Sequence, residues 1–127
     1  MRYVFLLLSI LGLSCTENTV DAQNKLTPDA FEALLKRDTT IQLVDVRTPD
    51  EFQSGYLAGA QNLNIQNADF VQKISQMDKS RPVLVYCAVG GRSVKAASQF
   101  SGLGFLNVYD LKGGMTAWKA AGKPVEK

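Results

Sequence analysis

Residues 82–93 read Pro-Val-Leu-Val-Tyr-Cys-Ala-Val-Gly-Gly-Arg-Ser, and this segment carries the clearest indication of the fold. Its first five residues form a short, β-rich apolar run, which predicts a buried strand over residues 82–86. A loop containing two glycines follows, and residues 93–100 have the pattern of a helix. Cys87 is therefore expected at the end of a strand, on the edge where open α/β sheets usually bind ligands.

Strand-like and helix-like segments alternate on both sides of this stretch. Thr27 and Thr48 each precede a proline, so each is expected to be the N-cap of a helix, and Glu51 completes a capping box for the second helix. This alternation predicts an α/β domain with a mostly parallel sheet. The expected helices cover residues 28–37, 49–54, 69–77, 93–100 and 116–121, and the expected strands cover residues 41–46, 60–65, 82–86 and 106–111.

The composition limits the kinds of chemistry that the chain can perform. A length of 127 residues predicts one domain, since domains usually take roughly 100–200 residues. The formal charge of +2 is spread along the chain, so no nucleic-acid partner is expected. With no histidine and two cysteines, the chain has too few soft ligands for a structural zinc site. No metal or other cofactor is expected.

Residues 1–15 have the layout of a bacterial signal peptide, with Arg2 before an apolar run that ends in Ser14 and Cys15. The run is too short for a transmembrane helix, which needs about 20 apolar residues. Residues 11–15 resemble the end of a lipoprotein signal, although Gly12 occupies the position where leucine is usual. The resemblance implies that Cys15 becomes the lipid-modified first residue of the mature chain. Plain cleavage of the signal is the alternative.

Residues 16–24 are polar and lack apolar periodicity, so they are expected to form a tether to the domain at residues 25–127. Together with the lipid, the tether would hold the domain to a membrane of the cell envelope. The expected location is outside the cytoplasm, facing the periplasm, or secreted if the signal is simply cleaved.

The residues after Cys87 are suited to binding an anion. Such a turn can point successive backbone N–H groups inward, and a helix N-terminus adds roughly half a positive charge. Gly90 and Gly91 relax the backbone, and Arg92 is placed to face an anion. The inward-pointing amides and the helix N-terminus would both stabilise a thiolate at Cys87 without a histidine. A lone cysteine at a strand end, without such neighbours, is more often an inert buried residue.

Short motifs along residues 25–125 resemble those of the rhodanese domain and occur in the same order. The resemblance implies a three-layer α/β fold with a central parallel β-sheet and helices on both faces. One position departs from the family, because Tyr56 follows Gly55 where histidine is common. The matching motifs are Asp45-Val46-Arg47, Glu51-Phe52 to Gly59-Ala60 with Asn62, Cys87 to Ser93, and Gly113-Gly114 to Trp118.

The resemblance implies a thiosulfate sulfurtransferase in which Cys87 takes the outer sulfur of a small anionic donor and holds it as a persulfide. A thiol, cyanide or a sulfur-acceptor protein then receives the sulfur. Asp45, Arg47 and Glu51 are expected to form a structural charge network. The expected substrate-binding residues are those of the loop, Ala88, Val89, Gly90, Gly91 and Arg92.

Two other functions compete with this one. A rhodanese-like module can act without turnover, as a persulfide carrier or a redox sensor. Cysteine phosphatases and arsenate reductases also bind an oxyanion between a cysteine and an arginine. Phosphatase loops, however, have one more residue in this interval than the four between Cys87 and Arg92.

Overall fold

The computed structural model of the chain describes residues 24–127. The predicted signal at residues 1–15, with Cys15, and nearly all of the predicted tether lie outside the described residues. Among residues 24–127, no helix is both long and apolar enough to span a bilayer. The strands are β1 (Lys25–Leu26), β2 (Gln42–Asp45), β3 (Gln61–Asn62), β4 (Val83–Tyr86) and β5 (Val108–Leu111). The helices are α1 (Pro28–Arg37), α2 (Pro49–Gln53), α3 (Phe70–Ser75), α4 (Gly91–Gly102) and α5 (Gly114–Ala120).

The five strands form one parallel sheet in the order β1-β5-β4-β2-β3. Strand β4 is central, with Val85 in register with Val44 of β2 and with Asp110 of β5. Because all strands are parallel, the ends of β2, β4 and β5 lie along the same edge. This edge carries the residue that follows β4, Cys87.

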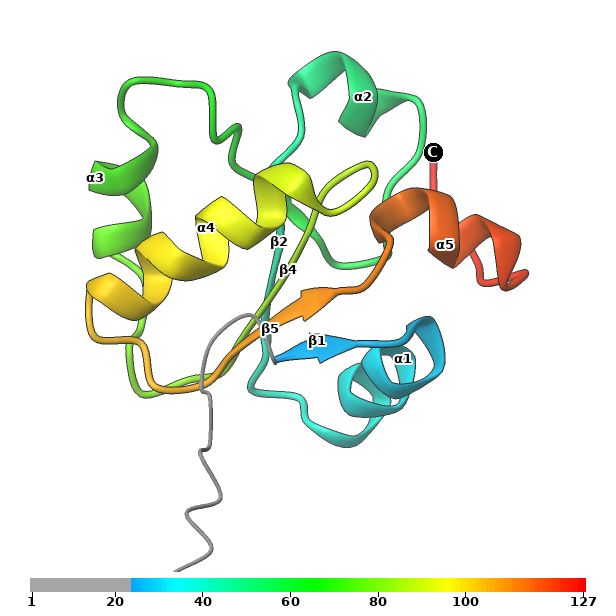
Figure 1. The fold of residues 1–127 in the computed structure, drawn as a ribbon, viewed down its shortest axis with the longest axis horizontal. Helices are drawn as coiled ribbons and strands as arrows, with labels where there is room; N and C mark the ends of the chain where they lie inside the picture. The colour runs from blue at the N-terminus through cyan, green and yellow to red at the C-terminus, as the bar shows by residue number, and fades with distance from the viewer. Residues whose placement is uncertain (1–23) are drawn as a thin grey trace, which may run out of the picture.

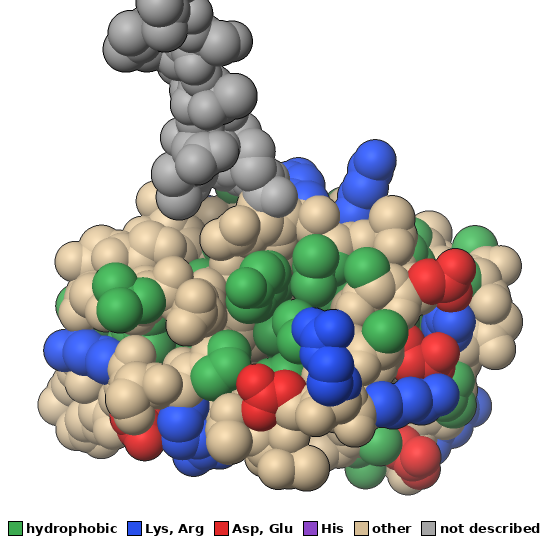
Figure 2. Space-filling model, turned by 90° about the horizontal axis from the view of Figure 1, so that it is seen from below, with side chains coloured by type: hydrophobic (Ala, Val, Ile, Leu, Met, Phe, Trp, Pro, Cys, Tyr) green, Lys and Arg blue, Asp and Glu red, His purple; other side chains and the backbone are tan. Residues whose placement is uncertain are grey.

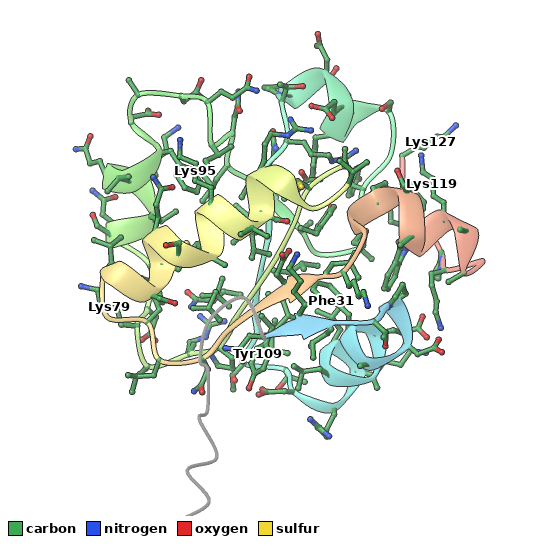
Figure 3. All side chains as sticks on the ribbon, viewed as in Figure 1. Phe31, Lys79, Lys95, Tyr109, Lys119 and Lys127 are labelled. Carbon is green, nitrogen blue, oxygen red and sulfur yellow. The ribbon has the colours of Figure 1, made fainter. Side chains whose placement is uncertain are left out.

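Alternate residues of β4 face two separate hydrophobic layers. Val83 and Val85 pack in the layer that contains α3 and α4, whereas Leu84 and Tyr86 pack with α1 and α5. Figure 1 shows the sheet between these two pairs of helices. On the α1 side, Phe31, labelled in Figure 3, makes an edge-to-face contact with Trp118. These layers confirm the three-layer α/β fold with helices on both faces.

Threonine caps fix where the first two helices begin, as the sequence predicts. The Thr27 hydroxyl oxygen accepts a hydrogen bond from the Ala30 N–H at 3.2 Å. At α2, Thr48 and Glu51 form a reciprocal capping box. This box orients the Glu51 carboxylate at the start of α2, near the edge of the sheet that carries Cys87.

Several element boundaries differ from the sequence-based prediction. Strand β1 has two residues and no periodic pattern, so the sequence gives no signal for it. Helices α4 and α5 begin two residues earlier than predicted, at Gly91 and Gly114. The N-cap residues Gly90 and Gly113 have φ of 116° and 74°. These values lie in the left-handed region, which residues other than glycine rarely adopt, so the glycines allow each helix to begin earlier.

The surface carries charges of both signs. In Figure 2, Lys, Arg, Asp and Glu side chains are interspersed around a group of hydrophobic side chains. Lys79, Lys95 and Lys119, labelled in Figure 3, are exposed. A hollow lies between α1 and the sheet, and none of its lining residues belongs to the loop after Cys87. Its lining residues are Leu26, Ala30, Ala33, Leu34, Arg37 and Tyr109.

Candidate active site

Cys87 directly follows the central strand and is 1% exposed. It belongs to the hydrophobic layer under α4, which includes Val85, Ala96 and Phe100. The loop from Ala88 to Gly90 then leads into α4, so the positive end of a 12-residue helix faces the cysteine. The thiol thus lies at the base of the loop, between the sheet edge and the helix N-terminus.

The Cys87 sulfur belongs to a closed ring of three hydrogen bonds with Gly90 and Ser93. The Gly90 N–H donates to Cys87 Sγ at 3.0 Å. The Cys87 thiol donates to Ser93 Oγ at 3.3 Å, and the Ser93 hydroxyl donates to the Gly90 carbonyl at 3.2 Å. When the thiol loses its proton, the Ser93 hydroxyl can turn and donate to the sulfur instead. A thiolate would then have one backbone donor and one hydroxyl donor already in place.

Helix α5 fixes the loop from the other side. The Met115 N–H donates to the Cys87 carbonyl at 2.8 Å, and the Thr116 N–H donates to the Ala88 carbonyl at 3.0 Å. This close approach requires glycine at position 114, where φ is 57° and a Cβ atom would lie 2.5 Å from the Cys87 carbonyl oxygen. The glycine pair of the last motif therefore allows α5 to hold the backbone of the cysteine loop.

Arg92 lies in the first turn of α4 and forms a bidentate ion pair with Glu51. Its two terminal nitrogens lie 2.7 and 2.9 Å from the two carboxylate oxygens. The Arg92 hydrogen bonds lower the pKa of Glu51 to about 2, against its partial burial. Glu51 in turn raises the pKa of Arg92, and the negative charge available at Cys87 adds to this effect. An anion bound above the loop would share Arg92 with Glu51.

The predicted network of Asp45, Arg47 and Glu51 is divided in the structure, because Glu51 pairs with Arg92. Arg47 and Asp45 form a separate, buried pair, with Arg47 Nη2 2.7 Å from Asp45 Oδ2. The same nitrogen donates to the Gly55 carbonyl at 2.6 Å. The guanidinium also lies 5.7 Å from the centre of the Tyr86 ring. This geometry ties the end of β2 to the segment after α2, which fits a structural role.

The predicted loop residues lie together, but their environments differ. Ala88 is half-buried and Val89 is exposed, whereas Gly90 is buried against the sulfur. Gly91 begins α4. Of these residues, Gly90 contacts the Cys87 sulfur, whereas the Arg92 side chain contacts Glu51.

Two buried polar residues, Ser93 and Asp110, have no role predicted from the sequence. Ser93 is fully buried and contacts the sulfur, and Asp110 is buried on β5 beside β4. Both had a recognisable signal. Ser93 lies in the first turn of a helix that follows the cysteine loop, and Asp110 interrupts an apolar strand, where a carboxylate is costly.

The fold and site together define an α/β protein with a cysteine loop at the carboxyl edge of a parallel sheet. The family model described as "Rhodanese-like domain" matches residues 27–121. The chain therefore belongs to the rhodanese-like family.

Two named relatives and one solved structure illustrate the similarity. The chain is 31% identical over 118 residues to chloroplastic thiosulfate sulfurtransferase 16 of Arabidopsis thaliana, covering 83% of this chain and 98% of the relative. It is 40% identical over 82 residues to thiosulfate sulfurtransferase GlpE of Shewanella oneidensis, covering 65% and 79%. A rhodanese-related protein of Thermoplasma volcanium is 29% identical, with a TM-score of 0.71 over 80% of this chain and 96% of that chain.

Proposed function

We propose that the protein is a sulfurtransferase that moves sulfane sulfur from a donor such as thiosulfate to a thiol or cyanide through a persulfide on Cys87. One observation carries the proposal: Cys87 Sγ lies at the N-terminus of α4, with the Gly90 N–H donating to it at 3.0 Å and the Ser93 hydroxyl 3.3 Å away. These groups suit a sulfur anion. The names of the relatives above give independent support.

The reaction needs no general base and no cofactor. The Cys87 thiolate attacks the outer sulfur of thiosulfate, a new S–S bond forms, and the old S–S bond breaks with its electron pair leaving on sulfite. The acceptor then attacks the outer sulfur of the persulfide and releases the thiolate. With cyanide or an ionised thiol as the acceptor, neither displacement requires a proton transfer, so a chain without histidine is suited to this reaction.

In this mechanism the loop stabilises negative charge at two stages. The Gly90 N–H and the start of α4 face the sulfur of the thiolate and of the persulfide. Arg92, which retains Glu51 as its partner, attracts the anionic donor. Ala88, Val89 and Gly91 complete the loop around the incoming sulfur. The acceptor reaches the site past the exposed Val89 and is a small thiol, cyanide or a protein thiol.

Mass spectrometry and a turnover assay test this function together. After incubation with thiosulfate, the peptide that contains Cys87 should gain the mass of one sulfur atom and lose it on treatment with a reductant. With cyanide present, thiocyanate should accumulate over many turnovers. A mass gain without turnover would favour the carrier alternative. No mass gain, with hydrolysis of an aryl phosphate, would replace the proposal by a phosphatase.

Arg92→Ala should weaken turnover while the protein stays folded. Loss of one preorganised charged donor reduces turnover by roughly 10- to 1,000-fold, and the Gly90 amide remains in place. Glu51→Gln is the matched control, because it leaves Arg92 present but frees it from its carboxylate partner. We expect the KM for thiosulfate to fall in Glu51→Gln. Equal losses in both variants would mean that the ion pair acts only on the fold.

We further propose that Cys15 carries a lipid that holds the protein outside the cytoplasm. The support is the sequence of residues 1–15 and the polar residues that follow. The mature N-terminal peptide should begin with a lipid-modified Cys15, and Cys15→Ala should leave the membrane fraction. An unmodified N-terminus at another residue would support plain secretion, and retention of residues 1–15 would contradict export.

A further inference from the structure

Asp110 is a buried carboxyl that the proposed sulfur transfer does not use. It is 4% exposed, and among residues 24–127 neither of its carboxyl oxygens has a hydrogen-bond partner. A buried carboxylate without partners is costly, so such a group keeps its proton to a higher pH. Burial raises the pKa of Asp110 above its usual value, and the Ser93 hydroxyl is the group that most opposes this increase.

The position of Asp110 connects it to the cysteine. It lies on β5 in register with Val85, two residues before Cys87 on the neighbouring strand. Helix α4 packs against β5, and its buried Ser93 contacts Cys87 Sγ at 3.3 Å. Ser93 also lowers the pKa of Asp110, so it is close to both groups. In the structure the Ser93 hydroxyl donates to the Gly90 carbonyl and not to Asp110, so Asp110 is a second acceptor near a hydroxyl that already contacts Cys87.

The charged and titratable groups nearest to Asp110 lie on β1, on α4 and at the end of β4. Lys25 of β1 is in register with Asp110, and its positive charge lowers the pKa of Asp110. From α4, Arg92 is held by Glu51, and Lys95 is exposed. From the end of β4, the titratable group is Cys87 itself. Burial outweighs these groups, and the pKa of Asp110 remains raised.

The Ser93 hydroxyl has one hydrogen and several acceptors that compete for it. It donates to the Gly90 carbonyl while Cys87 is a thiol. A Cys87 thiolate and an ionised Asp110 would each require the same hydrogen. A protonated Asp110 accepts poorly and can itself donate to Ser93 Oγ, which leaves the Ser93 hydrogen free for the sulfur.

We propose that Asp110 is a positioning residue that controls the sulfur of Cys87 through Ser93: its protonated carboxyl leaves the Ser93 hydroxyl to the sulfur, and its ionised carboxylate withdraws it. The inference rests on the proposed sulfur transfer and adds a pH-dependent control to it. As pH rises through the Asp110 titration, the sulfur loses a donor and gains a nearby negative charge. Persulfide formation in the wild type should therefore be slower above the Asp110 titration than in a variant whose residue 110 cannot ionise.

The first test compares rates of persulfide formation from thiosulfate across pH. Asp110→Asn keeps the shape of the protonated carboxyl but cannot ionise. It should match the wild type at low pH and exceed it by about tenfold where Asp110 is ionised, the value of one hydrogen bond to a charged group. In a Ser93→Ala background, the gain from Asp110→Asn should be much smaller, because only the effect of the carboxylate charge on the sulfur remains. Coincident profiles of Asp110→Asn and wild type, or an equal effect without Ser93, would overturn the proposal.

The second test does not depend on sulfur transfer. Carboxyl ¹³C NMR, with Asp110→Asn to assign the signal, follows the Asp110 titration directly. In Ser93→Ala its midpoint should move to higher pH, because the hydroxyl no longer stabilises the carboxylate. A movement in a protein that takes up no sulfur at any pH would refute the proposed function and leave the Asp110–Ser93 link standing. An unmoved midpoint would refute the link, whatever the activity.

Discussion

Cys87→Ser should fold normally and transfer no sulfur above the uncatalysed background. Serine keeps the shape of the side chain and can accept the Gly90 N–H, so the loop should persist. A serine hydroxyl is a poor nucleophile unless a base activates it, and the chain contains no histidine. Thiocyanate formation from thiosulfate and cyanide measures the loss, and circular dichroism confirms the fold.

Cys15→Ser is the matched control for this substitution, since Cys87 and Cys15 are the two cysteines of the chain. It should keep the turnover of the wild type when assayed in detergent. Sulfur transfer at the wild-type rate by Cys87→Ser would move the persulfide to another atom and overturn the mechanism.

Arg47→Ala should lower the free energy of unfolding by about 3–5 kcal/mol, the usual cost of removing one partner from a buried ion pair. The Arg47 and Asp45 side chains are 5% and 0% exposed, so the substitution leaves a buried carboxylate without its cation. It also removes the donor to the Gly55 carbonyl. Denaturant unfolding followed by circular dichroism measures the change.

Lys73→Ala provides the comparison for an exposed ion pair. Lys73 and Asp69 are 51% and 48% exposed, and such pairs contribute about 0–1 kcal/mol. The contrast separates the effect of burial from that of charge. If Arg47→Ala left unfolding unchanged while sulfur transfer collapsed, Arg47 would belong to the reaction rather than to the scaffold.

The sequence predicts those elements whose signals are local. The strand before Cys87 is an apolar run, and Thr27 and Thr48 mark helix starts that the structure confirms. The cysteine loop also follows from local order, because a strand, two glycines and a helix are adjacent in the chain. These features need no knowledge of which strands are neighbours.

Features that depend on packing between distant segments could not be predicted in this way. Glu51 and Arg92 are 41 positions apart, and their pairing requires the positions of α2 and α4. Asp110 becomes significant only because β5 lies beside β4 and under α4. The order of the strands could not be predicted from the sequence either, because β1 and its partner β5 lie at opposite ends of the domain sequence.

The hydrogen bonds from Met115 and Thr116 to the cysteine loop have a consequence for the growing chain. A ribosome adds about 5–20 residues per second, so Cys87 is synthesised on the order of seconds before the amides that fix its carbonyl. The interval is longer still for strand β1, which is synthesised first and pairs with β5. The Cys87 loop is therefore among the last parts of the domain to acquire its final hydrogen bonds, and a chain truncated before α5 would carry the Cys87 thiol without the two amides that hold the loop.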